Sequence, residues 1–203
     1  MYVLNKISYF NPPISPFRTE SGQLYPATVV PSAKVSVEQL YRMIVDPDGR
    51  LARLTNQVRA SKDYRSAKVQ MLPYVTPYGV FSERRSKGLL SYSGLIPLDF
   101  DYLVSEFEAQ ELRDWIFSDN RLDAKLVFVS PSGRGVKAFI SYERLLEPGE
   151  VVCKQTLNRF LENALFYVSS SFGRDLGACA DHSGKDIARA CLLCHDAGAK
   201  FQV

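Results

Sequence analysis

Two acids stand one residue apart at the end of an apolar run, in the stretch SGLIPLDFDYL at residues 93–103. Side chains alternate across a strand, so Asp99 and Asp101 are expected to share one face, with Leu98 and Phe100 buried on the other. Two like charges this close raise each other's pKa unless a positive group joins them. Hard divalent cations prefer carboxylate oxygens, so the pair is a candidate site for Mg²⁺ or Mn²⁺. The alternative is a solvated strand end that leads into a loop.

A glycine-rich turn, SPSGRGVKAF at residues 130–139, joins two apolar segments. Its glycines allow backbone conformations that direct amides at one anion, and its serines and basic residues add donors and positive charge. Ala138 and Ile140 face away from the side of Lys137, so its charge is expected to point at the pocket of the two acids. Phosphate ligands beside metal ligands are the arrangement of phosphoryl-transfer sites. The candidate phosphate-binding residues here are Ser130, Ser132, Gly133, Arg134, Gly135 and Lys137. The alternative is an ordinary hairpin turn with a surface arginine and lysine.

A third constellation, ADHSGKDIARACLLCHD, covers residues 180–196. Asp181 is a candidate third carboxylate for the same metal site, supplied from another strand end. Arg189 is a candidate phosphate ligand. Asp186 either caps a short turn or pairs with Arg189. The alternative for the whole segment is a solvated acidic turn with a surface salt bridge.

The CLLCH sequence within this segment also fits two metal patterns. Haem attachment uses C-x-x-C-H, but that chemistry belongs outside the cytoplasm. Zinc would need four ligands, from Cys191, Cys194 and His195 together with Cys179 or His182. The segment reads better as an apolar strand in which cysteines act as small, buried hydrophobic residues.

The first part of the chain, residues 1–70, combines a proline-rich stretch with helical segments. Proline fixes φ and lacks an amide donor, so the start is expected to be extended segments and turns. The sequence SVEQ fits a capping box at Ser36, and apolar residues then recur at helical spacing up to Ile44. Residues 50–70 are polar, basic and expected to be helical. Residues 71–94 show little periodicity and are expected to form a long connection, of the kind that is usually functional or mobile.

From residue 94 onward the pattern becomes regular. The expected elements are a strand at 94–100, a helix from Ser105 with Phe107, Leu112, Trp115 and Ile116 on its apolar side, strands at 124–130 and 136–142, and an amphipathic helix over 157–168. A strand-helix-strand unit followed by a hairpin indicates a mixed or antiparallel sheet with helices packed on one side. The sequence therefore predicts an α+β fold, in which residues 1–70 pack on a core formed by residues 71–203.

The composition leaves several partners open. The 203 residues are 46% hydrophobic, which is enough for a buried core, and a net charge of +3 permits a nucleic-acid partner without requiring one. No apolar run approaches the ~20 residues of a membrane span. The start, MYVLNKISYFNPP, lacks the charged head and long apolar region of a signal peptide. We therefore expect a cytoplasmic protein with no membrane partner, whose four cysteines are free thiols.

Four motifs stand in order: LPYVTPYGVFSERR, SGLIPLDFDYL, FVSPSGRGVKAF and DHSGKDIARACLLCHD. Together they closely resemble the VirE-type N-terminal domain family of bacterial mobile elements, over roughly residues 70–198. That family in turn is similar to the archaeo-eukaryotic primase superfamily, the primase-polymerases. The resemblance implies a core of RRM-like strand-helix units. It also implies a domain that usually precedes other modules, such as a helicase.

The resemblance also implies roles for individual residues. Asp99 and Asp101 match the superfamily's D-x-D strand, and Asp181 is the best match to its third acid, with Arg189 following as a basic residue. The second motif matches the turn and strand that end at Lys137, which stands where a histidine usually contacts the nucleotide. Lysine neutralises a triphosphate as a point charge without reproducing imidazole geometry. The implied activity is that of a nucleotidyltransferase that binds a nucleoside triphosphate and Mg²⁺ or Mn²⁺ and primes or extends DNA or RNA.

Two other functions remain open at this point. One is a catalytically degenerate nucleic-acid-binding module on the same fold, which the lysine in place of histidine motivates. Its basic track would comprise Arg53, Arg59, Lys62, Arg65, Lys68 and residues 82–88, with Tyr74, Tyr78 or Phe81 stacking on bases. The other is a phosphatase of the aspartyl-nucleophile type, which also starts from a strand-borne D-x-D. Such enzymes usually carry Thr or Val where Leu103 stands, and their motif lies near the domain start.

Overall fold

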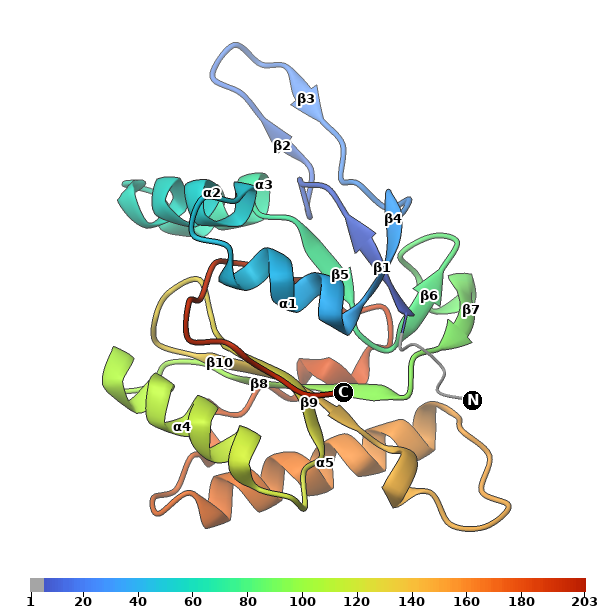
Figure 1. Cartoon of the computed structure of the whole chain (residues 1–203). Helices are drawn as coiled ribbons and strands as arrows, with labels where there is room; N and C mark the ends of the chain where they lie inside the picture. The colour runs from blue at the N-terminus through green and yellow to red at the C-terminus, as the bar shows by residue number, and fades with distance from the viewer. Residues whose placement is uncertain (1–5) are drawn as a thin grey trace.

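The central sheet of the computed structural model has the strand order β12-β9-β10-β8, and all of its pairings are antiparallel (Figure 1). Its strands are β8 (Leu95–Phe100), β9 (Ala124–Val129), β10 (Val136–Ser141) and β12 (Lys200–Phe201). Helix α4 (Glu106–Ser118) connects β8 to β9, and β10 lies between these two strands. The expected order of strand, helix, strand and hairpin is therefore confirmed, as is the α+β fold class.

The structure describes residues 6–203. The expectation about a signal peptide rests partly on the first five residues, which lie outside this range. No helix in the described part has the length and apolar character that a membrane crossing requires.

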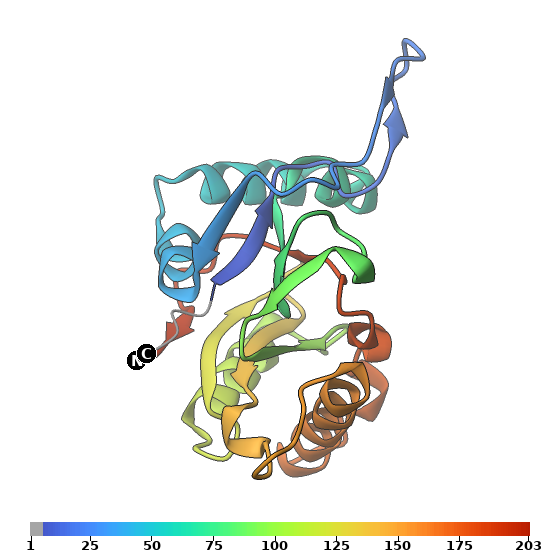
Figure 2. The ribbon, with the colours of Figure 1, turned by 90° about the vertical axis from the view of Figure 1, so that its right-hand side faces the viewer.

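A second sheet has the order β11-β5-β1-β4, also with antiparallel pairings. Its strands are β1 (Lys6–Phe10), β4 (Ala33–Ser36), β5 (Tyr74–Thr76) and β11 (Cys191–Leu192). Two short pairs complete the strands: β2 (Phe17–Arg18) with β3 (Leu24–Tyr25), and β6 (Gly79–Phe81) with β7 (Leu89–Tyr92). Strands from both sides of residue 70 share the second sheet. Figure 2 shows the β2–β3 hairpin projecting away from the rest of the molecule.

The expectation of a long connection over residues 71–94 is wrong, because this segment contains β5, β6 and β7. Strands β5 and β6 are three residues each, and all six residues are buried. A strand covered on both faces shows no alternation of apolar and polar residues, so the pattern that would have predicted it is missing.

The helices of the first 71 residues are α1 (Val37–Val45), α2 (Arg50–Ala60) and α3 (Tyr64–Met71). The capping box at the start of α1 is confirmed, since Gln39 N–H donates to Ser36 Oγ over 3.1 Å and Ser36 N–H donates to Gln39 Oε1 over 2.8 Å. The helical segment expected over 50–70 is two helices. The second of these is capped at its N-terminus by Asp63, whose carboxylate accepts from Ser66 N–H over 3.1 Å.

The later helices begin and end close to the expected residues. Helix α5 spans Lys154–Ser171, and Ser105 caps α4 by accepting from Glu108 N–H over 3.1 Å. Phe107 is 67% exposed, so its expected place on the apolar side of α4 is wrong. It stands nine residues, or two and a half turns, before the buried Ile116, which puts it on the opposite side of the helix. Short 3₁₀ turns span Ser86–Gly88, Glu143–Leu145, Gly177–Cys179 and His182–Lys185.

The central sheet is covered on both faces. Helices α4 and α5 pack on one face, where Leu98 and Phe100 point, as expected. The second sheet and α1 pack on the other face, against side chains that include Leu95 and Phe139. The helices are therefore not all on one side of the sheet: Figure 1 shows α1 on one face and α4 and α5 on the other.

Candidate functional site

The first two functional side chains are paired across the central sheet. The register of β8 and β10 places Lys137 directly opposite Asp99, on the face that points away from α4 and α5. Lys137 Nζ forms an ion pair with Asp99 Oδ2, and the lysine side chain is only 10% exposed. The expectation that Lys137 shares the pocket of the acids is confirmed.

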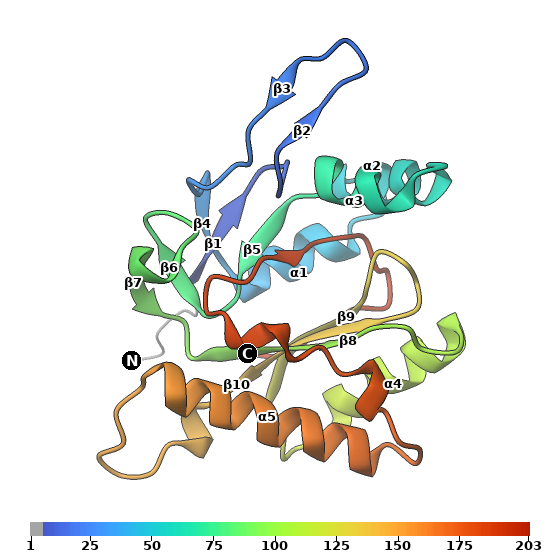
Figure 3. The same ribbon diagram turned by 180° about the vertical axis from the view of Figure 1, so that it is seen from behind.

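The third acid arrives on the segment that follows α5. This segment crosses the end of β8, where Asp181 N–H donates to Asp99 O and Asp101 N–H donates to Cys179 O, both over 2.8 Å. Figure 3 shows the segment running back from α5 across the end of β8 and on toward β5. The bridge is a single pair, Phe100 with Ala180, so the third acid follows an isolated bridge and not the strand that the sequence suggested.

Ligand oxygens of Asp99, Asp101 and Asp181 all lie within 4.8 Å of one another. Asp99 Oδ1 is buried and has no hydrogen-bond partner among residues 6–203, although a buried acceptor left unpaired costs free energy. Three carboxylates with one unpaired buried oxygen are a donor set that suits a hard divalent cation. The residues present therefore fit the Mg²⁺ or Mn²⁺ that the sequence predicted, and no other group of three or more His, Cys, Asp or Glu side chains within residues 6–203 meets the same spacing.

The three charged groups at the base of the site titrate differently. Burial, together with the charges of Asp101 and Asp181, raises the pKa of Asp99 despite the attraction of Lys137. Burial alone would lower the pKa of Lys137, but the facing carboxylates, Asp99 above all, outweigh burial and raise it. Burial alone would also raise the pKa of Asp181. Hydrogen bonds from Ser183 N–H (2.8 Å) and Oγ–H (2.6 Å) outweigh burial, so the pKa of Asp181 is lowered. The lysine therefore stays charged beside the acids.

The β9–β10 turn is held close to the acids by its glycine at residue 135. A Cβ on Gly135 would lie 2.6 Å from Phe100 O and 3.0 Å from Asp101 Oδ1, so only glycine allows this approach. Gly133 has φ +77°, and its N–H donates to Ser130 O over 2.9 Å, inside the turn. Neither glycine is among the residues that line the cavity described below, so the phosphate contacts of the Gly133 and Gly135 amides stay predictions.

A cavity of about 640 Å³ opens above the carboxylates. Eight of the ten residues selected from the sequence line it: Asp99, Asp101, Ser130, Ser132, Arg134, Lys137, Asp181 and Arg189. Arg189 pairs with Asp181 at 3.4 Å. Asp186 also lines the cavity and accepts from Ala188 N–H over 3.0 Å, so the turn-capping alternative for this residue is the one observed.

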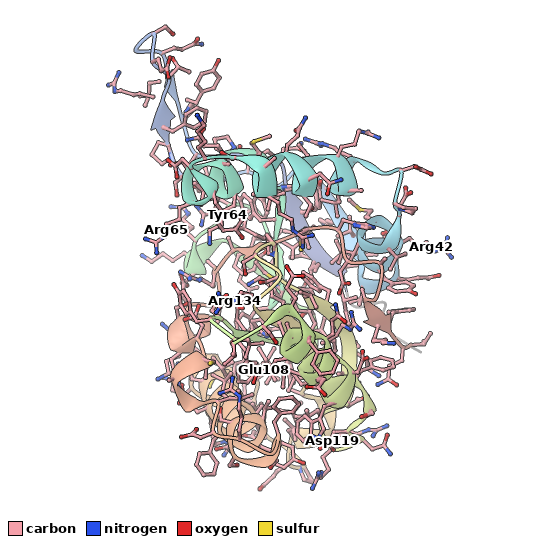
Figure 4. All side chains as sticks on the ribbon, turned by 90° about the vertical axis from the view of Figure 1, so that its left-hand side faces the viewer. Arg42, Tyr64, Arg65, Glu108, Asp119 and Arg134 are labelled. Atoms are coloured by element: carbon pink, nitrogen blue, oxygen red, sulfur yellow. The ribbon has the colours of Figure 1, made fainter. Side chains whose placement is uncertain are left out.

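Helix α3 supplies a wall of the cavity that the motifs did not indicate. Tyr64, Arg65 and Lys68 line it, and Figure 4 shows Tyr64 and Arg65 reaching from α3 toward Arg134 on the β9–β10 turn. Arg65 and Lys68 are three residues apart on one side of the helix, and the sequence predicts them only as part of a general basic track. Arg84, from the predicted basic stretch at 82–88, completes the lining cations.

The cavity carries more positive than negative charge. Its lining has six basic and four acidic side chains. Four of the cations, Arg65, Lys68, Arg84 and Arg134, have no carboxylate within 4.0 Å among the residues that the structure describes. Uncompensated cations around a cavity favour an anionic ligand, and phosphate is the usual one for arginine.

The prediction that Tyr74, Tyr78 or Phe81 stacks on bases is wrong. Tyr74 and Tyr78 are fully buried and Phe81 is 1% exposed, so none of them can reach a ligand. Tyr64 and Tyr102 line the cavity instead, and Tyr102 is 80% exposed with φ +61°. A non-glycine residue in this backbone region is uncommon, and such conformations cluster at functional sites.

Cys191 and Cys194 are buried, as the apolar alternative predicted, but the strand there is only the two residues of β11. Cys191 begins β11 and Cys194 lies three residues further on; both are buried, and all four cysteines are free thiols. Burial raises the pKa of Cys191 to about 12, and Cys194 Sγ–H donates to Val129 O over 3.1 Å. Protonated thiols in an apolar setting are poor zinc ligands.

These features define an α+β domain with an acidic floor and a basic rim around one cavity. A family model for the BT4734-like, N-terminal domain matches residues 66–201, which include all three acids and Lys137. The chain therefore belongs to the BT4734-like N-terminal domain family. Comparison with curated proteins and with solved structures gave no match. Tyr64 and Arg65 precede the matched residues, although they line the same cavity.

Proposed function

We propose that this chain is a primase-polymerase-like domain of a mobile-element protein, which binds a nucleoside triphosphate and a divalent metal to prime or extend a nucleic-acid strand. The convergence of Asp99, Asp101 and Asp181 within 4.8 Å, at the base of a basic cavity, carries this proposal. The ordered resemblance of the motifs to the VirE-type domain and the primase superfamily supports it. A helicase module of the same element and a cytoplasmic location are further predictions of this proposal.

The acidic residues of the site would bind the metal, and its basic residues supply positive charge. Asp99, Asp101 and Asp181 would hold Mg²⁺ or Mn²⁺, and Arg189 steadies Asp181 through their ion pair. When bound there, the metal supplies positive charge to the phosphates and activates an attacking 3′-hydroxyl. Lys137 keeps a permanent positive charge next to the same carboxylates.

The rest of the cavity suits the remainder of a nucleotide. Within residues 6–203, Arg65, Lys68 and Arg134 form no ion pair with a carboxylate, so their charges are available for phosphate oxygens. Tyr64 offers an aromatic ring from the same wall as Arg65. A cavity of about 640 Å³ is within the range of small-molecule and cofactor sites.

The test is extension of a primed template with a labelled nucleotide, in the presence of Mg²⁺ or Mn²⁺. Asp99→Asn and Asp101→Asn should each reduce incorporation by about a hundredfold or more, because several kcal/mol of charge stabilisation are lost. The control is Asp48→Asn, an exposed aspartate that does not line the cavity, which should incorporate like the wild type. Equal incorporation by Asp99→Asn and the wild type would reject the proposal.

A second candidate is a non-catalytic nucleic-acid-binding module on the same fold. The observation that favours it is the ion pair of Lys137 with Asp99, which already satisfies one oxygen of the acidic site without a metal. Under this reading the unpaired cations of the cavity bind the backbone of a single strand. Single-stranded DNA affinity that falls steeply with salt, without any metal-dependent incorporation, would select this candidate over the first.

A further inference from the structure

Lys137 is fixed more firmly than the other cations of the cavity. It lies on β10, which pairs with β8 on one side and β9 on the other, so its backbone is held by hydrogen bonds to both neighbouring strands. Its side chain is 10% exposed, whereas that of Arg189 is 53% exposed. A buried ammonium needs a carboxylate partner, because leaving it unpaired costs several kcal/mol. The ion pair with Asp99 is therefore a permanent part of the site.

The oxygens of the acidic site are not equally available. Asp99 Oδ2 is paired with the ammonium of Lys137, which repels a cation at that oxygen, whereas Asp181 Oδ1 accepts from the neutral Ser183 N–H, which leaves it able to bind a metal. Asp99 Oδ1 is buried with no partner, and Asp101 forms no ion pair with any residue that the structure describes. Lys137 therefore takes one oxygen of Asp99 and leaves the other, Oδ1, for a metal ion.

From this arrangement we infer that the site binds one divalent cation per chain, and that Lys137 occupies the place on Asp99 where a second cation would bind. A carboxylate bridges two metal ions by giving one oxygen to each, and Asp99 has only one oxygen left to give. The ammonium is a fixed single charge, so it neutralises a neighbouring phosphate without needing to be loaded from solution. This inference rests on the proposed function, since it concerns the same metal site.

The experiment is a titration of the full chain with Mn²⁺ alone, in which the electron paramagnetic resonance signal of free Mn²⁺ counts the bound ions. The wild type should bind one Mn²⁺ per chain at saturation. Lys137→Gln frees Asp99 Oδ2 and removes one positive charge, so it should bind two. Lys34→Gln removes the same charge from an exposed lysine that does not line the cavity, so it should still bind one.

The possible outcomes separate this inference from the function on which it rests. Two bound ions in the wild type would overturn the inference and leave the proposed function standing, as would one bound ion in folded Lys137→Gln. Absence of saturable binding in the wild type would overturn the metal site itself and with it the proposed function. If circular dichroism shows that Lys137→Gln is unfolded, Lys137→Met, of similar length and apolar, replaces it with the same expected count of two.

Discussion

The two faces of the central sheet use the same strands for different purposes. On one face, Leu98 and Phe100 of β8 meet α4 and α5 in an apolar layer. On the other face, Leu95 of the same strand packs under the second sheet, and four residues later Asp99 faces the cavity with Lys137 beside it. Alternation along a strand thus places core and site residues one position apart.

This difference shows that the elements packed on each face of the sheet decide where a strand can carry a charged side chain. A charged side chain inside the helix-covered layer would lose its hydration with nothing to replace it. At the end of β8 the cavity begins, and a carboxylate there has an ammonium, two neighbouring acids and open space around it. Substitutions on the two faces should therefore fail in different ways.

The largest expected effect on stability is on the helix-covered face. Leu98→Ala removes a side chain that is 1% exposed, so it should lower the free energy of unfolding by about 2–5 kcal/mol. Urea unfolding followed by circular dichroism measures this loss, while the folded fraction should still bind Mn²⁺. A loss below about 1 kcal/mol would contradict the placement of Leu98 in the core.

Gly135→Ala should lower both the free energy of unfolding and the affinity for Mn²⁺. Its Cβ would lie 2.6 Å from Phe100 O and 3.0 Å from Asp101 Oδ1, so the turn must move away from the acids, at a cost of about 1–3 kcal/mol. The same urea unfolding and Mn²⁺ titration report the two losses. Gly149→Ala is the control: its φ of +82° makes alanine strained, but no atom lies within 4 Å, so Mn²⁺ binding should be unchanged. Normal Mn²⁺ binding by folded Gly135→Ala would contradict this account of the turn.

Asp99 in the cavity and Asp119 between α4 and α5 should change the free energy of unfolding in opposite directions as the pH falls. The pKa of Asp99 is raised in the folded protein, so its charge opposes folding above that pKa, and this penalty disappears as the pH falls through it. The pKa of Asp119 is lowered, mainly because Arg121 and Tyr167 donate to its carboxylate between α4 and α5. Its stabilising contribution is present above the unfolded pKa and is lost as the pH falls.

Urea unfolding in EDTA across the acidic range separates these two groups. Relative to Asp99→Asn, the wild type should become more stable as the pH falls; relative to Asp119→Asn, it should become less stable. The difference in unfolding free energy between wild type and variant should thus change with pH in opposite directions for the two variants. A change in the same direction would contradict the conclusion that burial outweighs the attraction of Lys137 at Asp99.

The smallest effect concerns the thiols. Hydrogen bonds with Thr156 lower the pKa of Cys153, whereas burial raises that of Cys191 to about 12. Iodoacetamide at neutral pH should therefore label Cys153 first and leave Cys191 and Cys194 unmodified until the protein unfolds. Mass spectrometry of the labelled peptides gives the order, and early labelling of Cys194 would show that the segment is not packed as described.

Local signals in the sequence predicted much of this molecule. The capping residues Ser36 and Ser105 mark the starts of α1 and α4, and the alternation around Asp99 gives the correct face for each residue of β8. The position of Lys137 beside the acids follows from the same alternation, once the hairpin register is fixed.

The missing parts depend on long-range contacts. Strands β5 and β6 carry no alternation because both of their faces are covered, and Phe107 lies outside the apolar face because helix phase, not hydrophobicity, decides its direction. The wall that α3 contributes cannot be read from the motifs, since Tyr64 and Lys68 meet the acids only through the packing of segments far apart in the chain.

The most direct measurement is a crystal structure of the chain soaked with Mn²⁺ and a non-hydrolysable triphosphate analogue, with anomalous scattering collected for manganese. The account predicts one anomalous peak bounded by Asp99 Oδ1, Asp101 and Asp181, with Lys137 still on Asp99 Oδ2 and the triphosphate among the basic side chains of the cavity. A structure with no peak at these carboxylates, or with the triphosphate bound outside the cavity, would contradict it.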